Sequence, residues 1–338
     1  MSTNILSQPG PENIVILRAL PMGDLLSSVP AFRALRAALP DALITLVGLP
    51  FAAKFVKRFS AYLDHFISFP GFPGLSGQAS DITRFPEFLI HMQKSNFDLA
   101  IQMQNSGEIA NSLVRLWGAK RYAGFYTPGE YCPDKNRFLP YPRYEAEVWR
   151  HLRLVEFLGI PLQGDNLEYP FFENDWEEFR KLKERFDLAN EYVCIYPGAA
   201  SSERQWLATH FSTVADGLAS HGDQIVLIGN EQDASLTAAI AKKMKAPSLD
   251  LAGQTSLEQL AVLISQARFV VSNDADISQI ALSVNTSSID LFTVSDPYRW
   301  ASQARKTYKT ARQSGSLTPK EMLDYVETHL KEARAHVS

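Results

Sequence analysis

Polar residues that could bind a phosphate stand at the end of a predicted strand in the second half of the chain. The apolar run 269–271 ends in Ser272-Asn273, and Asp274 follows before a helix-like run at 280–284. In an open parallel sheet, ligands bind beyond the carboxyl ends of the strands. A helix that begins there presents unpaired N–H groups and its positive dipole end. The segment therefore predicts an anion-binding site.

The elements that would position this site alternate between strand and helix along the chain. The first half shows strand patterns at 13–20, 42–48 and 97–104 and helix patterns at 25–39, 51–59 and 108–116. After a helix at 175–186, strands are predicted at 191–198, 224–229, 269–272 and 288–292, with helices between them, one at 251–260, and a last helix from Thr318. This alternation predicts a parallel sheet in each half.

Composition narrows the class of protein. The 338 residues, 46% of them hydrophobic, suit two domains with full cores. A net charge of -4 argues against a protein whose main task is to grip nucleic acid. The N-terminus lacks a secretory signal pattern, and no run approaches the ~18 apolar residues of a membrane span, so we expect a cytoplasmic protein. Cys132 and Cys194 stand far apart, which favours neither a disulfide nor a thiolate metal site.

Several short motifs, in their order and spacing, carry a resemblance to a known family. They are residues 16–18 with 22–26, 30–31 and 35–36, then 197–199 with 204–206, then 251–257, 271–274, and 291–292 with 296–297. With them the sequence resembles glycosyltransferase family 9, the ADP-heptose:lipopolysaccharide heptosyltransferases. The resemblance implies an α/β fold of GT-B architecture, in which two Rossmann-like domains face a central cleft. It also implies metal-independent sugar transfer that inverts the anomeric carbon.

The resemblance also divides the chain into parts with separate tasks. Residues 1–170 would form an N-terminal Rossmann-like domain for the acceptor, and residues 171–317 a C-terminal Rossmann-like domain for the nucleotide-sugar donor. Residues 318–338 would form a helix that packs back toward the N-terminal domain. We expect no cofactor, because the nucleotide-sugar is a co-substrate, with an ADP-sugar as the leading candidate.

Asp24 is the candidate catalytic base. Inverting transfer needs a group that takes the proton of the acceptor hydroxyl as its oxygen attacks the anomeric carbon. Asp24 follows the first predicted strand, next to Gly23, which we count among the donor-binding residues. The alternative is an N-cap, because Gly-Asp before an apolar helix is also good capping chemistry.

The leaving nucleoside diphosphate needs a cation and hydrogen-bond donors if no metal neutralises its charge. Arg204, which we group with Asp24 as catalytic, stands where similar enzymes place a Lys or Arg, two residues before Trp206. Ser201 and Ser202 lie in the same loop and could bind the donor, while Glu231 matches an acidic position that can bind ribose hydroxyls. A surface arginine, ordinary turn serines and a solvated Glu231 are the alternatives.

The predicted donor loop, Asn273 to Gln279, departs from the family pattern. The family continues Asn-Asp with Thr or Ser, then Gly, two residues and His, where this chain has Ala275, Asp276 and Gln279. We count Asn273, Asp274, Ala275, Asp276 and Gln279 as donor-binding. Asp274 and Asp276 also form a DxD pattern, which can bind a metal. Two acidic residues at a helix start more often act as a cap and a partner of the helix dipole. We therefore assign no metal site.

Acceptor recognition is expected in the first half. Its Pro/Gly-rich loops at 69–77 and 126–134 are longer than simple connections need, and such loops often line clefts. Basic and aromatic candidates are Lys54, Lys57, Arg58, Lys120, Arg121, Lys135 and Arg137, with Tyr122, Phe125, Tyr126 and Tyr131.

The sequence therefore predicts a glycosyltransferase that moves a sugar, with heptose as the leading donor sugar, to a lipopolysaccharide-core, glycolipid or polysaccharide acceptor. It would work in the cytoplasm, with peripheral association at the inner membrane as an open point. A degenerate relative that binds a glycan or protein without catalysis is the first alternative, and a nucleotide-sugar epimerase of the same layout is the second. The departures in the donor loop separate the first two readings.

Overall fold

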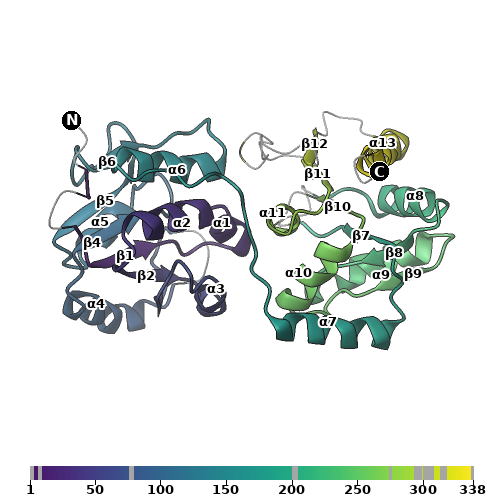
Figure 1. The fold of residues 1–338 in the computed structure, drawn as a ribbon, viewed down its shortest axis with the longest axis horizontal. Helices are drawn as coiled ribbons and strands as arrows, with labels where there is room; N and C mark the ends of the chain where they lie inside the picture. The colour runs from purple at the N-terminus through teal and green to yellow at the C-terminus, as the bar shows by residue number, and fades with distance from the viewer. Residues whose placement is uncertain are drawn as a thin grey trace. The chain divides into compact units, whose positions relative to one another are not determined.

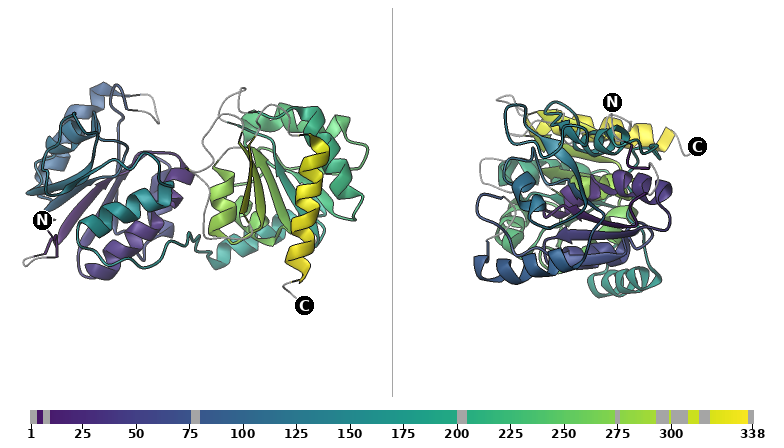
Figure 2. Two further views of the ribbon diagram at one scale, coloured as in Figure 1. Left: turned by 90° about the horizontal axis from the view of Figure 1, so that it is seen from above. Right: turned by 90° about the vertical axis from the view of Figure 1, so that its left-hand side faces the viewer.

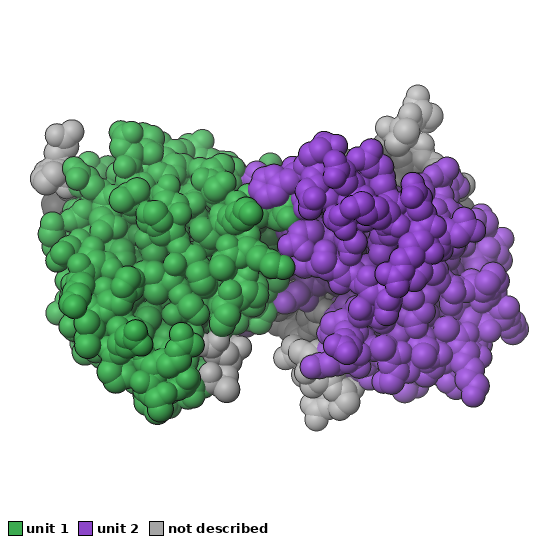
Figure 3. Space-filling model, turned by 90° about the horizontal axis from the view of Figure 1, so that it is seen from below, with its two compact units in different colours: residues 1–166 green, residues 167–338 purple. Residues whose placement is uncertain are grey.

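The computed structural model describes residues 4–6, 10–75, 80–199, 205–273, 276–292, 299, 308–312 and 318–335. The chain divides into two compact units, Met1–Asn166 and Leu167–Ser338, which Figure 3 colours separately. Each unit is built around one parallel sheet with helices packed against it (Figure 1). Both Rossmann-like domains expected from the sequence are confirmed, and the central cleft between them stays a prediction.

The strands of the first unit follow the order β3-β2-β1-β4-β5-β6, and every pair is parallel. The chain winds outward from β1 in one direction and then from β4 in the other, as in a doubly wound fold. The strands are β1 (Asn13–Leu17), β2 (Leu43–Gly48), β3 (His65–Ser68), β4 (Leu99–Gln102), β5 (Arg121–Tyr126) and β6 (Phe138–Pro140).

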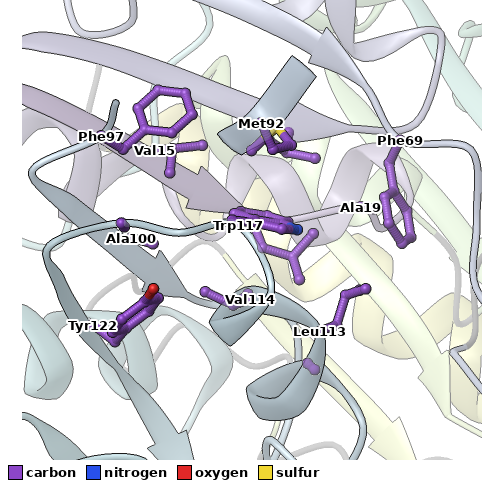
Figure 4. Packing of buried hydrophobic residues seen from close by; sticks show 14 of the residues in the cluster. Val15, Ala19, Phe69, Met92, Phe97, Ala100, Leu113, Val114, Trp117 and Tyr122 are labelled. Carbon is purple, nitrogen blue, oxygen red and sulfur yellow. The ribbon is translucent and has the colours of Figure 1, made fainter. Parts of the chain in front are cut away.

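Helices cover both faces of this sheet. On one face, α4 and α5 pack over Val15 and Ala100, and Trp117 lies in this core with its ring against Phe88 (Figure 4). On the other face, α2 and α6 lie side by side (Figure 1). The helices are α1 (Met22–Leu26), α2 (Val29–Ala38), α3 (Ala52–Arg58), α4 (Phe85–Lys94), α5 (Ala110–Arg115) and α6 (Glu147–Phe157), with a 3₁₀ turn at Ile82–Arg84.

The second unit repeats the same winding, with the order β12-β11-β10-β7-β8-β9. Its strands are β7 (Tyr192–Tyr196), β8 (Gln224–Leu227), β9 (Ser248–Asp250), β10 (Phe269–Asn273), β11 (Ser288–Phe292) and β12 (Tyr308–Arg312). Its helices are α7 (Glu173–Phe186), α8 (Ala208–Ala219), α9 (Ala234–Lys243), α10 (Leu257–Gln266), α11 (Ile277–Ser283) and α13 (Pro319–Ala335), with a 3₁₀ turn at Glu231–Asp233.

The last helix, α13, packs on α8 within the second unit, as Figure 2 shows. Met322 and Val326 of α13 are fully buried in that unit's core. The packing of this helix toward the first unit, expected from the family resemblance, stays a prediction. None of the described helices is both long and apolar enough to span a membrane.

Two helices differ from their predicted bounds. The helix predicted at 25–39 is two helices, because Pro30 has no N–H to donate to the preceding turn and the chain restarts at Val29. At the break, the hydroxyls of Ser27 and Ser28 donate to main-chain carbonyls four residues back. The helix predicted at 251–260 begins at Leu257, because Ser256 caps it by accepting a bond from Gln259 N.

Candidate active site

Asp24 and Gly23 lie in α1, directly after the carboxyl end of β1. There the strand order reverses between β1 and β4, which is the point at which doubly wound sheets bind ligands. The N-cap interpretation of Asp24 is wrong, because the cap position is Pro21 and the helix already begins at Met22. Asp24 stands in the first helical turn with 14% of its side chain exposed, so its carboxylate reaches the surface at this edge.

Arg18 holds the segment that carries Asp24. Its guanidinium, 1% exposed, donates to the main-chain oxygen of Asp24 at 2.9 Å and to Asp24 Oδ1 at 3.4 Å. The other terminal nitrogen donates to Met103 O at 2.7 Å, just beyond β4. One cation therefore ties the end of β1 to α1 and to the end of β4.

Gln104, two residues beyond the end of β4, fixes the same segment. Its side-chain oxygen accepts a bond from Ala19 N at 2.6 Å, and its side-chain nitrogen donates to Ala19 O at 3.1 Å. Both atoms of this buried amide are thus used on one residue of the β1–α1 connection. The pair of bonds restrains the backbone just before the candidate base.

Glu147, the first residue of α6, completes a buried charge cluster. Its carboxylate lies 3.1 Å from Arg18 and 2.9 Å from Arg150, and the side chains of all three residues are at most 5% exposed. Buried charges are tolerated when they are paired and hydrogen-bonded. Glu147 therefore balances two cations that the fold could not otherwise bury.

His151 lies one turn further along α6, with Nε2 at 3.5 Å from Glu147 Oε1. Complete burial, followed by the charge of Arg18, lowers the pKa of His151 to about 4. The imidazole is therefore neutral near pH 7, but its side chain is only 2% exposed and cannot reach an acceptor hydroxyl, whereas the carboxylate of Asp24 reaches the surface. Sequence reasoning missed Gln104, Glu147 and His151, and it quoted Arg18 without giving it a task. The available signal was Arg18 itself, a charge inside an apolar strand pattern.

In the second unit, Asn273 ends β10 with a fully buried side chain. Its amide nitrogen donates to Pro197 O at 2.5 Å, and its oxygen accepts a bond from Trp206 N at 3.4 Å. The side chain thus joins both ends of the loop after β7 to β10. Its direct contact with a donor stays a prediction, and what the structure shows is a residue that positions the loop.

Several predicted donor residues lie outside the described residues: Ser201, Ser202, Arg204, Asp274 and Ala275. Of the others, Glu231 is exposed in the turn after β8, Asp276 is exposed just before α11, and Gln279 is buried in the first turn of α11. The described structure therefore brings part of the predicted donor site to one edge of the second sheet, and the predicted contacts stay untested.

Asp233 is an acidic residue at this edge that sequence reasoning missed. It accepts bonds from Asn230 N at 2.9 Å and from the Tyr196 hydroxyl at 3.3 Å. Burial raises the pKa of Tyr196, and the negative charges of Asp233 and Asp276 raise it further. A Cβ on Gly198 would lie 2.6 Å from Asp233 Oδ1, so this glycine lets the loop approach the carboxylate.

Some of the acceptor candidates are wrong. Tyr122 and Phe125 are 7% and 1% exposed, because β5 is buried on both faces, and they cannot stack on a sugar ring. Lys120 and Arg137 are paired with Asp98 and Asp134, and their contact with an acceptor stays a prediction. Tyr131 is half exposed and stays a candidate.

Comparison with known proteins identifies the family. Residues 88–328 match the sequence model of glycosyltransferase family 9 (heptosyltransferase). Lipopolysaccharide heptosyltransferase 3 of Escherichia coli (strain K12) is 26% identical over 288 residues, which are 82% of this chain and 81% of that protein.

Two solved structures share the fold. A family 9 glycosyl transferase from Veillonella parvula has a TM-score of 0.81 at 18% identity, over 95% of this chain and 98% of that one. The E. coli ADP-heptose lps heptosyltransferase II has a TM-score of 0.73 at 19% identity, over 95% and 99%. These likenesses confirm the GT-B type of fold. The chain belongs to glycosyltransferase family 9 and is a heptosyltransferase-like glycosyltransferase.

Proposed function

We propose that this protein transfers a heptose from ADP-heptose to a sugar of a lipopolysaccharide core, with inversion and without a metal ion. The observation that carries the proposal is Asp24, whose partly exposed carboxylate is held by Arg18 at the reversal point of the first sheet. The donor and acceptor follow from the names of the similar proteins, an ADP-heptose lps heptosyltransferase and a lipopolysaccharide heptosyltransferase.

In the proposed reaction, Asp24 accepts the proton of the acceptor hydroxyl as the hydroxyl oxygen bonds to the anomeric carbon of the donor. The bond from that carbon to the diphosphate breaks on the opposite face, and ADP leaves with the electron pair. Arg18 orients the carboxylate through one side-chain and one main-chain bond. Because Arg18 also pairs with Glu147, its charge is shared and does not act on Asp24 alone.

In the same proposal, ADP binds at the carboxyl edge of the second sheet. Glu231, exposed after β8, accepts bonds from ribose hydroxyls, and Arg204 neutralises the charge that develops on the diphosphate. The proposal assigns no metal to this step. In the ranges that the structure describes, which leave out Asp274, no three His, Cys, Asp or Glu side chains come together as metal ligands. We place the reaction in the cytoplasm, at the inner face of the membrane that carries the acceptor.

The test is a transfer assay with ADP-heptose, and with UDP-, GDP- and CDP-sugars for comparison, on lipopolysaccharide whose core lacks heptose. We expect ADP release and a mass increase of one heptose, both unaffected by EDTA, with an inverted anomeric configuration by NMR. Transfer that is lost in EDTA and restored by Mn²⁺ would contradict the metal-independent step. Acceptor binding without turnover from any donor would instead support the non-catalytic alternative.

A further inference from the structure

Residues 158–172, here called the connector, join α6 of the first unit to α7 of the second (Figure 1). The connector leaves α6 in a Schellman motif, in which Gly159 has a φ of 86°. Its two bonds run from Gly159 N to Glu156 O at 2.9 Å and from Ile160 N to Val155 O at 3.0 Å. The start of the connector is therefore closed against the end of α6.

The segment that precedes β1 holds the same point. Ile5 is 1% exposed, and its N–H donates to Leu158 O at 3.0 Å. The side chain of Asn4 lies so close to Gly159 that a Cβ there would come within 2.6 Å of it. The first residues of the chain thus hold the connector where it begins.

Arg33, on α2, holds the next part of the connector. Its Nε donates to Gln163 O at 3.2 Å, and one terminal nitrogen donates to Gly164 O at 3.4 Å and to Asn166 O at 3.0 Å. One side chain therefore binds three carbonyls of a segment that forms neither helix nor strand. Because a guanidinium is planar and its donors have a fixed geometry, it sets the direction of this backbone as well as its distance from α2.

The far end of the connector is held by the second unit. Tyr169 is 6% exposed, and its ring centroid lies 5.6 Å from that of Phe171. The Phe171 ring in turn lies 5.3 Å from that of Trp176 on α7. Phe172 N donates to Asp175 Oδ2 at 2.8 Å. This end of the connector therefore moves with α7.

The two anchors decide where the chain can bend. Units of one chain move relative to each other by default, unless a large apolar interface joins them. With the carbonyls held as far as Asn166 and the aromatic rings packed from Tyr169, this motion is taken up between those two residues. Without Arg33 the bend can spread back to Gly164, where a Cβ would meet no atom within 4 Å and where glycine rotates readily.

We propose that Arg33 is a positioning residue for the sugar transfer, because it fixes the direction in which the connector leaves the first unit. The inference rests on the proposed function. With the base in the first unit and the donor in the second, the reacting atoms meet correctly only over a narrow range of unit positions. Arg33 acts on the reaction through the connector, not through contact with a substrate.

The test measures distances between the units by double electron–electron resonance on the full chain. Spin labels are attached to Lys94→Cys on α4 and Lys242→Cys on α9, both at exposed positions, in a Cys132→Ser background. Cys194 is fully buried and stays unlabelled. This labelled parent is compared with Arg33→Gln and Arg33→Lys, and thermal melting checks the folding of each variant.

Arg36→Gln is the matched control. Arg36 lies on the same helix and also binds carbonyls through its guanidinium, but its partners lie outside the connector. They are Pro40 O, Ala42 O, Tyr62 O and the carboxylate of Asp64. A loss of stability alone would therefore appear in both arginine variants.

We expect Arg33→Gln to widen the distribution of label distances and to lower kcat for heptose transfer roughly tenfold, because a misplacement of about 1 Å can cost up to about 10²-fold. The Kd of ADP, measured by calorimetry, should not change. Arg33→Lys, which keeps a donor but loses the planar fork, should restore part of both effects. Arg36→Gln should match the parent in distance distribution and in kcat.

Two results would overturn the inference. One is a distance distribution in Arg33→Gln no wider than in Arg36→Gln, and the other is a wider distribution with an unchanged kcat. The label distances need no turnover, so they separate this inference from the proposed function. If the distribution widens but the parent transfers no sugar from any donor, the anchoring by Arg33 stands and the proposed function fails. If the parent transfers heptose and Arg33→Gln equals it in both measurements, the proposed function stands and the role of Arg33 fails.

Discussion

The two sheets have the same strand order, but their carboxyl edges differ in how charged side chains are arranged. At the first edge, Arg18, Glu147 and Arg150 are buried and alternate in sign. At the second edge, the negative charges of Asp233 and Asp276 act on Tyr196, and Glu231 is exposed in the turn after β8. The same backbone frame thus supports a balanced, rigid setting in one unit and an acidic one in the other.

The difference fits a division of labour. A base must be held in one orientation, which a closed ion network achieves, because each partner restrains the next. A donor site must bind a charged ligand and release it again. Its cation, which we propose to be Arg204, must therefore be able to pair with the ligand. Four substitutions, at Asp24, Glu147, His151 and Asp276, test this difference between the two edges.

The largest effect is expected for Asp24→Asn at the first edge. The substitution removes the base but keeps the shape, and the bond from Arg18 to the main-chain oxygen remains. Transfer should fall by about 10²–10⁴-fold, the range for loss of a general base. Steady-state kinetics of ADP release measure this, with thermal melting as the check on folding. Turnover equal to that of wild type would remove Asp24 from the reaction.

Glu147→Gln should break the balance of the buried cluster. Two buried cations would lose their shared carboxylate, and loss of one partner of a buried pair costs about 3–5 kcal/mol of stability. The matched control is Glu156→Gln on the same helix, an exposed partner of Arg153 that should cost less than about 1 kcal/mol. Urea unfolding measures both. Equal losses would mean that the first edge is no more dependent on charge balance than the surface.

The pH dependence of stability should carry the signature of His151. The pKa of His151 in the folded protein is about 4, below the usual 6.5. Between these two pH values, the unfolded chain binds a proton that the folded chain does not bind. The stabilisation is complete above pH 6.5 and is lost as the pH falls toward 4, by on the order of 3 kcal/mol. His151→Leu should flatten this part of the curve, whereas His221→Gln, at an exposed site, should not. Parallel curves for wild type and His151→Leu would contradict the assignment.

Asp276→Gly gives the smallest expected effect, at the second edge. The exposed carboxylate would repel a diphosphate, and relief of about 1 kcal/mol should tighten ADP binding roughly fivefold in EDTA. Isothermal calorimetry on wild type and variant measures the change, and a DxD metal site would show instead as tighter binding by wild type when Mn²⁺ is added. Weaker ADP binding by the glycine variant in EDTA would contradict the expected repulsion between Asp276 and the diphosphate.

The sheets and the place of Asp24 could be predicted from the sequence because they depend on local pattern. Buried parallel strands appear as apolar runs, and a polar residue just after such a run lies at the sheet edge. Strands β3, β6 and β9 were missed because they have only four, three and three residues and are partly exposed. Strands β5 and β12 were missed as well.

The partners of Arg18 could not be predicted in the same way. Glu147 is separated from Arg18 by 129 positions, and no local pattern connects them. Arg18 stands in an apolar run, and burying a charge without a partner costs too much free energy. The sequence therefore indicates that Arg18 has a partner, but it does not indicate which residue that partner is. Tyr122 and Phe125 were misplaced for a related reason, since an aromatic residue in a loop-flanking strand looks the same whether it faces a ligand or the core.

The long separation of Arg18 and Glu147 sets an order of events during synthesis on the ribosome. Strand β1 and its arginine emerge early, but the carboxylate that neutralises Arg18 arrives only with α6, more than a hundred residues later. At about 5–20 residues per second, the nascent chain spends several seconds or more before this guanidinium gains its buried partner Glu147. A fragment that ends before α6 would therefore lack a stable first sheet, and limited synthesis or cleavage at that point should produce a chain recognised by chaperones and proteases.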